Sequence, residues 1–268
     1  MYLPILTTLL AWLAAPPPAT VQAPPDNARR ITRECLGGKA RFDVYLVDLD
    51  EQQLDILHNG NAKAPRPITL DQVRGAYKKS DNALQFATNG GMYMPDYGAQ
   101  GLLIRAGHVE YPLNTKEQPR PFTNFYSIPP NGVFYLTHSG VPGIAPRDRV
   151  PSLDSLTLAT QSGPMLVLDG QLNPGLDRAS ETSRKLRSGV GVKQGRNSIM
   201  GKYEMVFIIS VEPINFECFA RAFLYYGCTD ALYLDGVISE AYFAEPYTCC
   251  QRRGGRQGFG SVLTVMER

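Results

Sequence analysis

The sequence has little that would mark a metal enzyme or a nucleic-acid binder. Its 268 residues include only three histidines, which stand alone, and five cysteines without a CxxC pair. Ligand spacings typical of zinc sites are therefore missing, and no metal or other cofactor is expected. Basic residues exceed acidic ones by a formal charge of only +2, without a long basic run. We expect no nucleic-acid partner and no attraction to an anionic membrane surface.

Long hydrophobic runs are also scarce. The apolar stretch from Tyr2 to Ala15 is too short to span a bilayer comfortably, and Val21-Gln22-Ala23 supplies a small-x-small cleavage site. We expect residues 1–23 to be a signal peptide, with an uncleaved membrane anchor as the main alternative. After cleavage no stable membrane span is expected, and the protein would be periplasmic or secreted.

The odd number of cysteines leaves at least one thiol free or paired with another chain. A predicted helix separates Cys218 from Cys228, and its rise of about 1.5 Å per residue holds their Cα atoms beyond the roughly 7 Å limit for a disulfide. Pairing of Cys228 with Cys249 or Cys250 is geometrically freer. The sequence leaves the pairing among all five cysteines, Cys35 included, open.

The chain divides into a leader, a linker and one domain. Residues 24–40 are rich in Pro and Ala and then charged, which favours a linker, and residues 41–268 are expected to fold as one domain. Most of this domain should be β-structure, because apolar runs are separated by turns that contain Gly or Asn. The runs at 41–50 and 52–60, which flank Asp50-Glu51, have the signature of a hairpin. Further strands are predicted within 84–94, 101–111, 131–138, 163–173, 188–195, 203–210, 231–236 and 258–268.

Two helices are predicted. A short one lies around Leu70 to Lys79, and a longer one lies in NFECFARAFLYYG, where Phe219 and Phe223 fall on one face with other apolar residues. Asn215 can cap the start of the second helix and Gly227 its end. An aromatic stripe of this kind is more typical of core packing than of a ligand site.

Four short polar signatures stand at the ends of predicted strands. They are NGGMYMPD (Asn89 to Asp96), QSGP (Gln161 to Pro164), KLRSGVGV, which contains Arg187, and LYLDG, which ends in Asp235-Gly236. Each alone is weak, because Asn-Gly and Asp-Gly are common turn dipeptides. Together they place amides, an arginine and a carboxylate beside glycines. Such a set suits the binding of sugar hydroxyls and a phosphate.

The order of these motifs resembles the phosphodiester glycosidase family, typified by the mammalian lysosomal uncovering enzyme, an N-acetylglucosamine-1-phosphodiester alpha-N-acetylglucosaminidase. The segments PNGVFY, QSGPML and LYLDG-x-IS are similar to those of a branch of exported bacterial proteins. The resemblance runs from about Arg41 to Val265. It implies a single α/β (α+β) domain with a mixed, strand-rich sheet and few helices, and hydrolysis of a sugar 1-phosphodiester.

The resemblance and the residue chemistry together predict the site. Asp235 is expected to be the catalytic carboxylate and Arg187 the phosphate ligand. Glu240 is a candidate second carboxylate, although odd spacing puts it on the opposite face of a shared strand unless the turn at Gly236 redirects it. The predicted substrate-binding residues are Asn89, Gly90, Gly91, Tyr93, Asp96, Gln161, Ser162, Gly163, Gly236 and Ser239. For Asp96 a turn role is the alternative.

One departure from the family concerns the residues after Asp235-Gly236. Many members have flexible glycines where this chain has Val237 and Ile238, which predicts a narrower or differently shaped pocket. This departure bears on the identity of the substrate more than on the reaction.

The expected function is that of an exported hydrolase that cleaves the glycosidic C–O bond of a sugar 1-phosphodiester in an envelope or exopolysaccharide-type glycan. Phosphate leaves as a stable anion, so the reaction needs a cation for the departing oxygens and a carboxylate near the anomeric carbon more than it needs a general acid. The alternatives are a non-catalytic glycan-binding envelope protein and a phosphodiesterase that cuts P–O. A nucleophilic role for Ser162 is not expected, because the G-x-S-x-G elbow is missing.

Overall fold

β-Strands are the main secondary structure of the protein. A computed structural model describes residues 27–35, 38–61, 63–78, 83–116, 126, 128–176, 183–193, 205–244 and 257–268. Of these residues, 52% lie in strands and 11% in helices. The strand pairs in this part of the chain are antiparallel. The predicted α/β class with a mixed sheet is therefore wrong, because the crossover helices that parallel neighbours need are not used.

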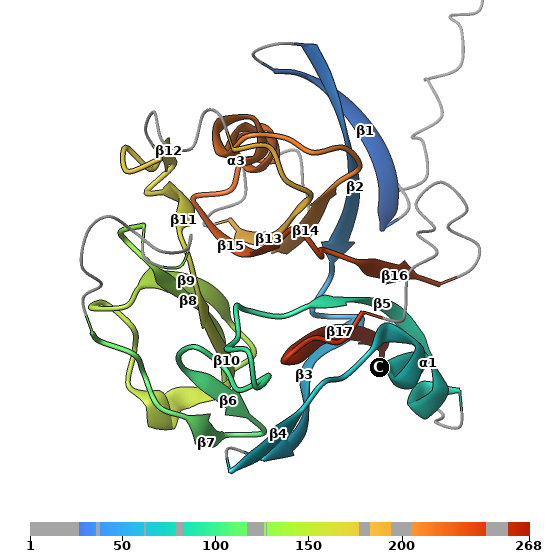
Figure 1. Ribbon diagram of the computed structural model, residues 1–268, viewed down its shortest axis with the longest axis vertical. Coiled ribbons are helices and arrows are strands. Elements are labelled where there is room, and N and C mark those ends of the chain that lie inside the picture. Colours follow the sequence, from blue (N-terminus) through green and yellow to red (C-terminus); the bar gives the residue numbers. More distant parts are fainter. Residues whose placement is uncertain are drawn as a thin grey trace, which may run out of the picture.

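The strands form three sheets (Figure 1). In spatial order, the seven-stranded sheet contains β1 (Ala28–Cys35), β2 (Gly38–Val47), β14 (Met205–Ser210), β13 (Arg187–Val192), β15 (Asp230–Gly236), β11 (Met165–Leu168) and β12 (Gln171–Leu172). One five-stranded sheet contains β7 (His108–Tyr111), β6 (Leu103–Arg105), β10 (Leu156–Ser162), β8 (Gly132–Thr137) and β9 (Pro142–Pro146). The other contains β16 (Ala241–Phe243), β5 (Leu84–Asn89), β17 (Ser261–Glu267), β3 (Gln52–Asn61) and β4 (Ala64–Arg66). A 3-10 turn, Leu153–Ser155, precedes β10.

Helix α1 (Leu70–Tyr77) confirms the first predicted helix. The Thr69 side chain accepts a hydrogen bond from the Gln72 backbone, while the Gln72 side chain accepts one from the Thr69 backbone, so the helix begins with a capping box. Leu70 and Val73 are buried in a cluster with side chains of β5 and β17. The helix therefore covers the outer face of the sheet that contains β5.

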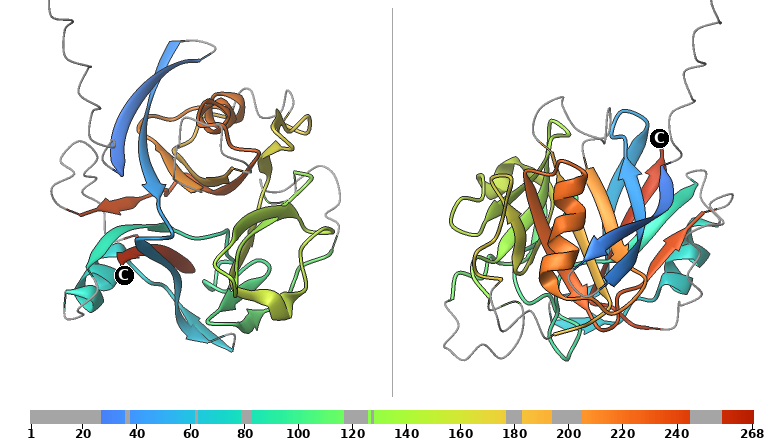
Figure 2. Two further views of the ribbon diagram at one scale, coloured as in Figure 1. Left: turned by 180° about the vertical axis from the view of Figure 1, so that it is seen from behind. Right: turned by 90° about the horizontal axis from the view of Figure 1, so that it is seen from above.

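Helix α3 (Phe216–Tyr225) confirms the second predicted helix together with its predicted ends. The Asn215 side chain accepts a hydrogen bond from the Cys218 backbone at 2.9 Å, and Gly227 has the left-handed φ of 74° that suits a residue just past a helix end. Its aromatic side chains pack in a cluster with residues of the seven-stranded sheet. Figures 1 and 2 show α3 on the face of that sheet that points away from the other two sheets.

One central core joins the three sheets. It contains Tyr45 and Phe207 from the seven-stranded sheet, Phe134 from β8, and Phe86 and Leu263 from the third sheet. The ring centroids of Tyr45 and Phe86 are 4.6 Å apart, and those of Phe86 and Phe207 are 5.1 Å apart. Buried aromatic contacts of this kind dominate core energetics, so they hold the ends of the three sheets in fixed relative positions.

Two local predictions about the start of the domain are corrected. Strands β2 and β3 do not form a hairpin with each other, because β2 pairs with β1 and β14 whereas β3 pairs with β17 and β4. The turn at Asp50-Glu51 therefore carries the chain from one sheet to another. The predicted linker 24–40 contains β1, which pairs along its whole length with β2. The predicted signal peptide lies outside the described residues.

The β1–β2 hairpin is fastened to the rest of the fold by covalent and ionic contacts. A disulfide joins Cys35 at the end of β1 to Cys218 in α3. Cys228 is a buried free thiol, as expected if it does not pair with Cys218, while Cys249 and Cys250 lie outside the described residues.

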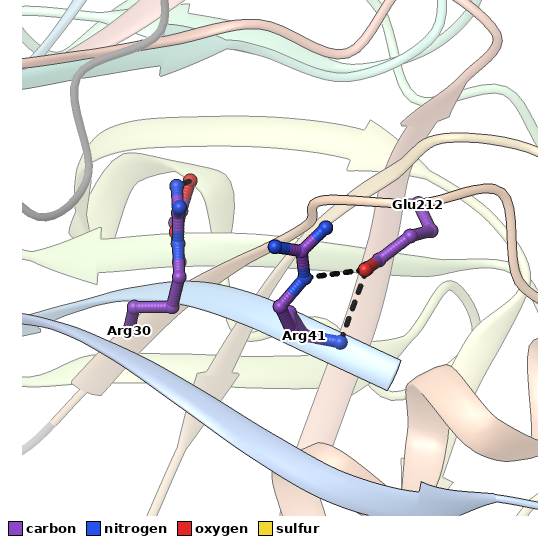
Figure 3. A network of polar contacts seen from close by, with 4 residues as sticks. Arg30, Arg41 and Glu212 are labelled. Atoms are coloured by element: carbon purple, nitrogen blue, oxygen red, sulfur yellow. Dashed lines mark hydrogen bonds and ion pairs between the residues drawn. The ribbon is translucent and has the colours of Figure 1, made fainter. Parts of the chain in front are cut away.

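Two arginines of the same hairpin form ion pairs. The Arg41 Nε atom lies 2.5 Å from Glu212 Oε1, and the Arg41 backbone donates to the same carboxylate (Figure 3). Next to this pair, Arg30 Nε lies 2.6 Å from Oδ1 of the fully buried Asp43. The hairpin therefore carries a buried carboxylate that has a guanidinium partner.

Candidate active site

Strands from all three sheets end or begin at one place. Strands β5, β10 and β15 end at Asn89, Ser162 and Gly236, and strands β13 and β17 begin at Arg187 and Ser261. The first four of these positions belong to the four polar motifs of the sequence, and Ser261 is an addition to them. Binding and catalytic residues often lie at the ends of strands and in the loops that follow them, because the packed sheets hold these positions rigidly.

Hydrogen bonds show that the motifs are in contact. Asn89 Nδ2 donates to Ser188 Oγ at 2.8 Å, which joins the NGG segment to the RSG segment. The Ser162 hydroxyl accepts from the Met92 backbone at 3.3 Å and donates to the Leu234 carbonyl at 3.1 Å. The predicted residues Asn89 and Ser162 therefore link the NGG, QSGP, RSG and LYLDG segments into one cluster.

A β-bulge directs the Asp235 side chain toward this cluster. In the pairing of β13 with β15, Gly189 lies opposite Tyr233 and Ser188 lies opposite Asp235, so Leu234 is an extra residue. Regular alternation would place Asp235 on the α3 side of the sheet with Tyr233. The bulge instead puts Asp235 on the face of its partner Ser188, whose hydroxyl contacts Asn89.

Asp235 is a buried carboxylate whose negative charge is stabilised by few neighbouring groups. It is 8% exposed, and within the described chain its one hydrogen bond comes from the Gly236 backbone. Burial raises the pKa of Asp235 to about 6, and the bond from Gly236 lowers it only in part. The buried Asp43, by contrast, has the guanidinium of Arg30 as its partner. A carboxyl with a pKa near 6 can exchange a proton close to neutral pH, which is the property a general acid or base needs.

Tyr93 lies close to this carboxylate. Burial raises the pKa of Tyr93 to about 12, and the negative charge of Asp235 contributes to that rise. The Tyr93 hydroxyl donates to the Gly258 carbonyl at 3.0 Å, which ties the loop after β5 to the segment before β17. Tyr93, a predicted substrate-binding residue, and Asp235, the predicted catalytic carboxylate, are therefore near enough to interact electrostatically.

Arg187 is directed to the other face of the same sheet. Its side chain is fully buried, with Nε donating to the Ile214 carbonyl at 2.8 Å and Nη1 to the Tyr233 hydroxyl at 3.1 Å. The guanidinium carbon lies 3.6 Å from the ring centroid of Phe216 in α3. Burial lowers the pKa of Arg187, while the contact with Tyr233 acts in the opposite sense. The structure thus separates Arg187 from Asp235, and phosphate binding by Arg187 stays a prediction.

Gln161 uses its amide to join loops around the site. Its Oε1 accepts from the backbones of Leu102 and Asn114, both at 2.9 Å, and its Nε2 donates to the Asn114 carbonyl and to Asn131 Oδ1. Two acceptor and two donor positions of the amide are therefore occupied. Gln161 holds the walls of the site, and contact with a sugar hydroxyl would exchange one of these four bonds.

The predicted site glycines are places of close backbone approach. A Cβ at Gly90 would collide with the Ser261 hydroxyl, and one at Gly91 would lie 2.7 Å from the Gln161 carbonyl. A Cβ at Gly163 would lie 2.7 Å from Asn131 Cβ, and one at Gly236 would collide with the Tyr233 hydroxyl. These glycines allow the motifs to pack against one another.

The remaining predicted residues lie around the turn regions. The exposed Asp96 accepts from the Gly98 backbone at 3.0 Å, which is the turn role considered as its alternative. The Ser239 hydroxyl donates to the Asp235 carbonyl at 3.0 Å and so fastens the turn after β15. Glu240 lies beyond this turn, next to β16, and its carbonyl accepts from the Thr88 hydroxyl. Glu240 is therefore redirected by the turn and does not share a strand with Asp235.

Sequence reasoning missed Ser188 and Ser261 as site residues. Ser188 is the cross-strand partner of Asp235 and the acceptor for Asn89. Ser261 is buried beside Gly90, and in the described chain its hydroxyl makes no hydrogen bond. The available signal was a serine next to a glycine at the start of an apolar strand, in RSGVGV and GSVLTV.

Possible metal ligands are dispersed in the part of the chain that the structure describes. No group of three or more His, Cys, Asp or Glu side chains is placed there to hold an ion. His58 is buried with Nδ1 3.2 Å from Glu110 Oε2, and burial lowers its pKa while Glu110 opposes that change. This pair connects β3 to β7 as a structural contact.

The family assignment follows from comparison of the sequence. The phosphodiester glycosidase family matches residues 82–262, which include all four motifs, and the chain belongs to this family. Protein YigE of Escherichia coli (strain K12), which is uncharacterized, is 36% identical over 166 residues. That alignment covers 61% of this chain and 59% of YigE, so the chain matches a little over half of its relative's length.

Solved structures share the fold. The catalytic domain of zebrafish N-acetylglucosamine-1-phosphodiester alpha-N-acetylglucosaminidase, auto-inhibited by its pro-peptide, superimposes with a TM-score of 0.61 at 13% identity and covers 92% of this chain and 85% of that one. A hypothetical protein from Synechocystis gives a TM-score of 0.54 at 11% identity, covering 90% and 62%. A putative exported protein from Burkholderia pseudomallei gives 0.51 at 10% identity, covering 85% and 74%. At these identities the likeness concerns the fold alone.

Proposed function

We propose that the protein hydrolyses the glycosidic C–O bond of a sugar 1-phosphodiester, with Asp235 as the catalytic carboxylate. The observation that carries the proposal is the environment of Asp235. It is buried at the junction of strand ends, a bulge turns it toward Ser188 and Asn89, and its pKa is raised to about 6. Membership of the phosphodiester glycosidase family supports the same reaction class.

The chemistry follows from the charge state of Asp235. At neutral pH a carboxyl with a pKa of about 6 is mostly ionised and can accept a proton from water. The water oxygen adds to the anomeric carbon, the bond from that carbon to the phosphate oxygen breaks, and the electron pair leaves with the phosphate monoester. Before the bond is complete, the negative carboxylate stabilises positive charge on the sugar ring.

Neutral polar groups around Asp235 are proposed to hold the substrate. Asn89, Ser188 and Ser261 present an amide and two hydroxyls next to the glycine loop, and these groups suit sugar hydroxyls and phosphate oxygens. Arg187 donates to the Tyr233 hydroxyl on the α3 face of the sheet, which is the face opposite to Asp235. We propose that it acts as a positioning residue behind the strand that carries Asp235.

We also propose that the protein acts outside the cytoplasm, in the periplasm or after secretion, on an envelope or exopolysaccharide-type glycan. The Cys35–Cys218 disulfide supports this location, because such bonds persist in oxidising compartments. A helix long and apolar enough to cross a membrane does not occur among the described residues. The likeness to a putative exported protein agrees with the proposal.

Hydrolysis in ¹⁸O-labelled water tests the reaction. Purified protein is screened against UDP-sugars and simple sugar 1-phosphodiesters, and the products of any cleaved substrate are analysed by mass spectrometry. We expect the label in the sugar, since water attacks carbon. Label in the phosphate would identify a phosphodiesterase that cuts P–O, and saturable sugar binding without any product would identify a glycan-binding protein.

A further inference from the structure

Left-handed backbone at non-glycine residues distinguishes two turns near Asp235. In the described chain such residues are Tyr97, Ala106, Asp169 and Val237, with φ of 72°, 47°, 50° and 106°. Ala106-Gly107 and Asp169-Gly170 form two-residue turns between paired strands, and both residues of each turn have positive φ. Hairpin turns of this type require that conformation. The other two residues need a different explanation.

Val237 is held in a conformation that its side chain disfavours. A β-branched residue with φ of 106° is an outlier, and glycine would adopt the same backbone without strain. Hydrogen bonds from the Val237 backbone to the Leu186 carbonyl and from the Ser239 hydroxyl to the Asp235 carbonyl, both 3.0 Å, enforce the turn. Val237 is 56% exposed, so packing within the fold offsets little of the free-energy cost of that strain.

The turn from Met94 to Gly98 has the same character. The Tyr97 backbone donates to the Met94 carbonyl and the Met94 backbone donates to the Gly98 carbonyl, each at 2.8 Å. The left-handed position in a three-residue loop of this kind is usually glycine, yet it holds Tyr97, whose ring stacks on Tyr93. Met94 is 47% exposed. This turn therefore combines a strained residue, Tyr97, with an exposed apolar residue, Met94.

Both turns border the carboxylate of Asp235. Val237 follows Asp235 by two residues, and Met94 follows Tyr93, which lies close enough to Asp235 for the two groups to interact electrostatically. Ile238 and Tyr93 pack against the same cluster of apolar side chains. Exposed aliphatic residues therefore lie in the turns that follow Asp235 and Tyr93, an arrangement that suits a ligand with a polar head and an alkyl chain.

We propose that Val237 and Met94 are specificity-determining residues that bind an alkyl chain esterified to the substrate phosphate, so that the preferred substrate class is a lipid-linked sugar 1-phosphate. The inference rests on the proposed function for the identity of the reaction. Burial of one methylene group strengthens binding by about fourfold, so contact with several methylenes compensates for the strain at Val237 and for the exposure of Val237 and Met94, which folding alone does not favour.

Calorimetric titration with hexyl phosphate and methyl phosphate tests the proposal without turnover. The parent protein should bind hexyl phosphate at least about tenfold more tightly than methyl phosphate, through burial of the added methylenes. The Val237→Ala variant keeps a strained residue but removes two methyl groups, and it should lose most of this preference. The Met94→Ala variant should lose part of it.

Two glycine variants separate ligand contact from strain. Val237→Gly should lose the alkyl preference and melt at a higher temperature than Val237→Ala, because glycine relieves the backbone. Ala106→Gly, at a left-handed turn between β6 and β7, should keep the parental preference.

Equal binding of the two phosphates by the parent, or a preference retained in both Val237 variants, would overturn the inference. Tight, Val237-dependent binding of hexyl phosphate with no cleavage of hexyl or methyl sugar 1-phosphodiesters would uphold the alkyl site while rejecting the proposed reaction. Cleavage of both esters with equal kcat/KM would uphold the reaction and reject the alkyl site.

Discussion

At the scale of single residues, the two buried carboxylates Asp43 and Asp235 differ in their electrostatic partners. Asp43 is neutralised by Arg30 on the neighbouring strand. Burial raises the pKa of Asp235, and the hydrogen bond from the Gly236 backbone offsets that rise only in part; none of the described residues forms an ion pair with it. A group kept in an unfavourable environment lowers stability, and active sites commonly show this exchange of stability for activity.

The first prediction concerns the pH dependence of stability in Asp235→Asn. The folded pKa of about 6 lies above the ordinary value of 3.8, so between these pH values the folded protein keeps a proton that the unfolded chain releases. The free energy of unfolding of the parent should therefore fall as pH rises through this window. The variant lacks this loss and should be more stable by up to about 3 kcal/mol at pH 7 to 8, with little difference at pH 4. Urea unfolding across this pH range measures both curves.

The matched control is Asp43→Asn, which should lower the free energy of unfolding at neutral pH, because it leaves Arg30 without its charged partner. Destabilisation by Asp235→Asn of the same size as that by Asp43→Asn would show that Asp235 is compensated in the fold. The proposed electrostatic character of the site would then be wrong.

The second prediction concerns Arg187→Lys. If Arg187 were the phosphate ligand expected from the sequence, this change would harm activity far more than folding, whereas the observed contacts predict a loss of both. Lysine cannot form the planar set of bonds to Ile214, Tyr233 and the Ser183 carbonyl, so we expect about 2–3 kcal/mol of destabilisation with reduced kcat/KM. Denaturant unfolding and turnover of the same preparation provide the measurement.

Arg221→Lys is the control for this experiment, since Arg221 is a largely exposed arginine paired with Glu217 one helical turn away. It should change stability by less than about 0.5 kcal/mol. If Arg187→Lys unfolds like the parent but loses turnover, Arg187 contacts the phosphate directly and the positioning role is rejected.

At the scale of secondary-structure elements, local signals predicted the helices and most strands but not the features that orient the site. Asn215 and Gly227 mark the ends of α3 because caps act within a few residues. The extra residue Leu234 in β15 depends on the register with β13, which the sequence does not reveal. Without the bulge, alternation would direct Asp235 toward Tyr233. The side on which the carboxylate lies could therefore be learned only from the structure.

The third prediction concerns the disulfide between β1 and α3. Replacing Cys35 and Cys218 by serine together removes a link across 183 residues of sequence, and we expect a loss of about 2–5 kcal/mol of stability. Turnover of the folded fraction should persist, because α3 packs on the face of the seven-stranded sheet opposite to Asp235. Urea unfolding and an activity assay below the transition test both parts. Cys228→Ala, which removes a free thiol, should cost less; an equal loss would argue against the disulfide as the source.

At the scale of the whole molecule, the order of strands in space could not be predicted. Strand β17 at the end of the chain lies between β3 and β5, and β14 lies between β2 and β13. Such pairings are fixed by long-range packing around Tyr45, Phe86 and Phe207 rather than by local propensity. The prediction of a hairpin at Asp50-Glu51 was wrong for this reason, because β2 pairs with β14 and β3 pairs with β17.

The sequence predicted which segments form the candidate site, but not how their side chains are oriented. The resemblance to the phosphodiester glycosidase family identified the segments that converge, and Asn89, Ser162 and Asp235 lie where they meet. It could not show that Arg187 faces α3 or that Ser188 and Ser261 line the site. These orientations depend on strand register and on close contacts at glycines, which emerge only when three sheets are packed together.

Turnover by Asp235→Asn, on a sugar 1-phosphodiester that the parent protein cleaves, tests the central claim most directly. Asparagine keeps the size and the turn preference of the residue but has no negative charge and cannot take a proton from water. The variant should fold, retain product binding and lose kcat by at least about a hundredfold. Near-parental turnover in a well-folded Asp235→Asn protein would contradict the account and reduce Asp235 to a structural residue at the end of β15.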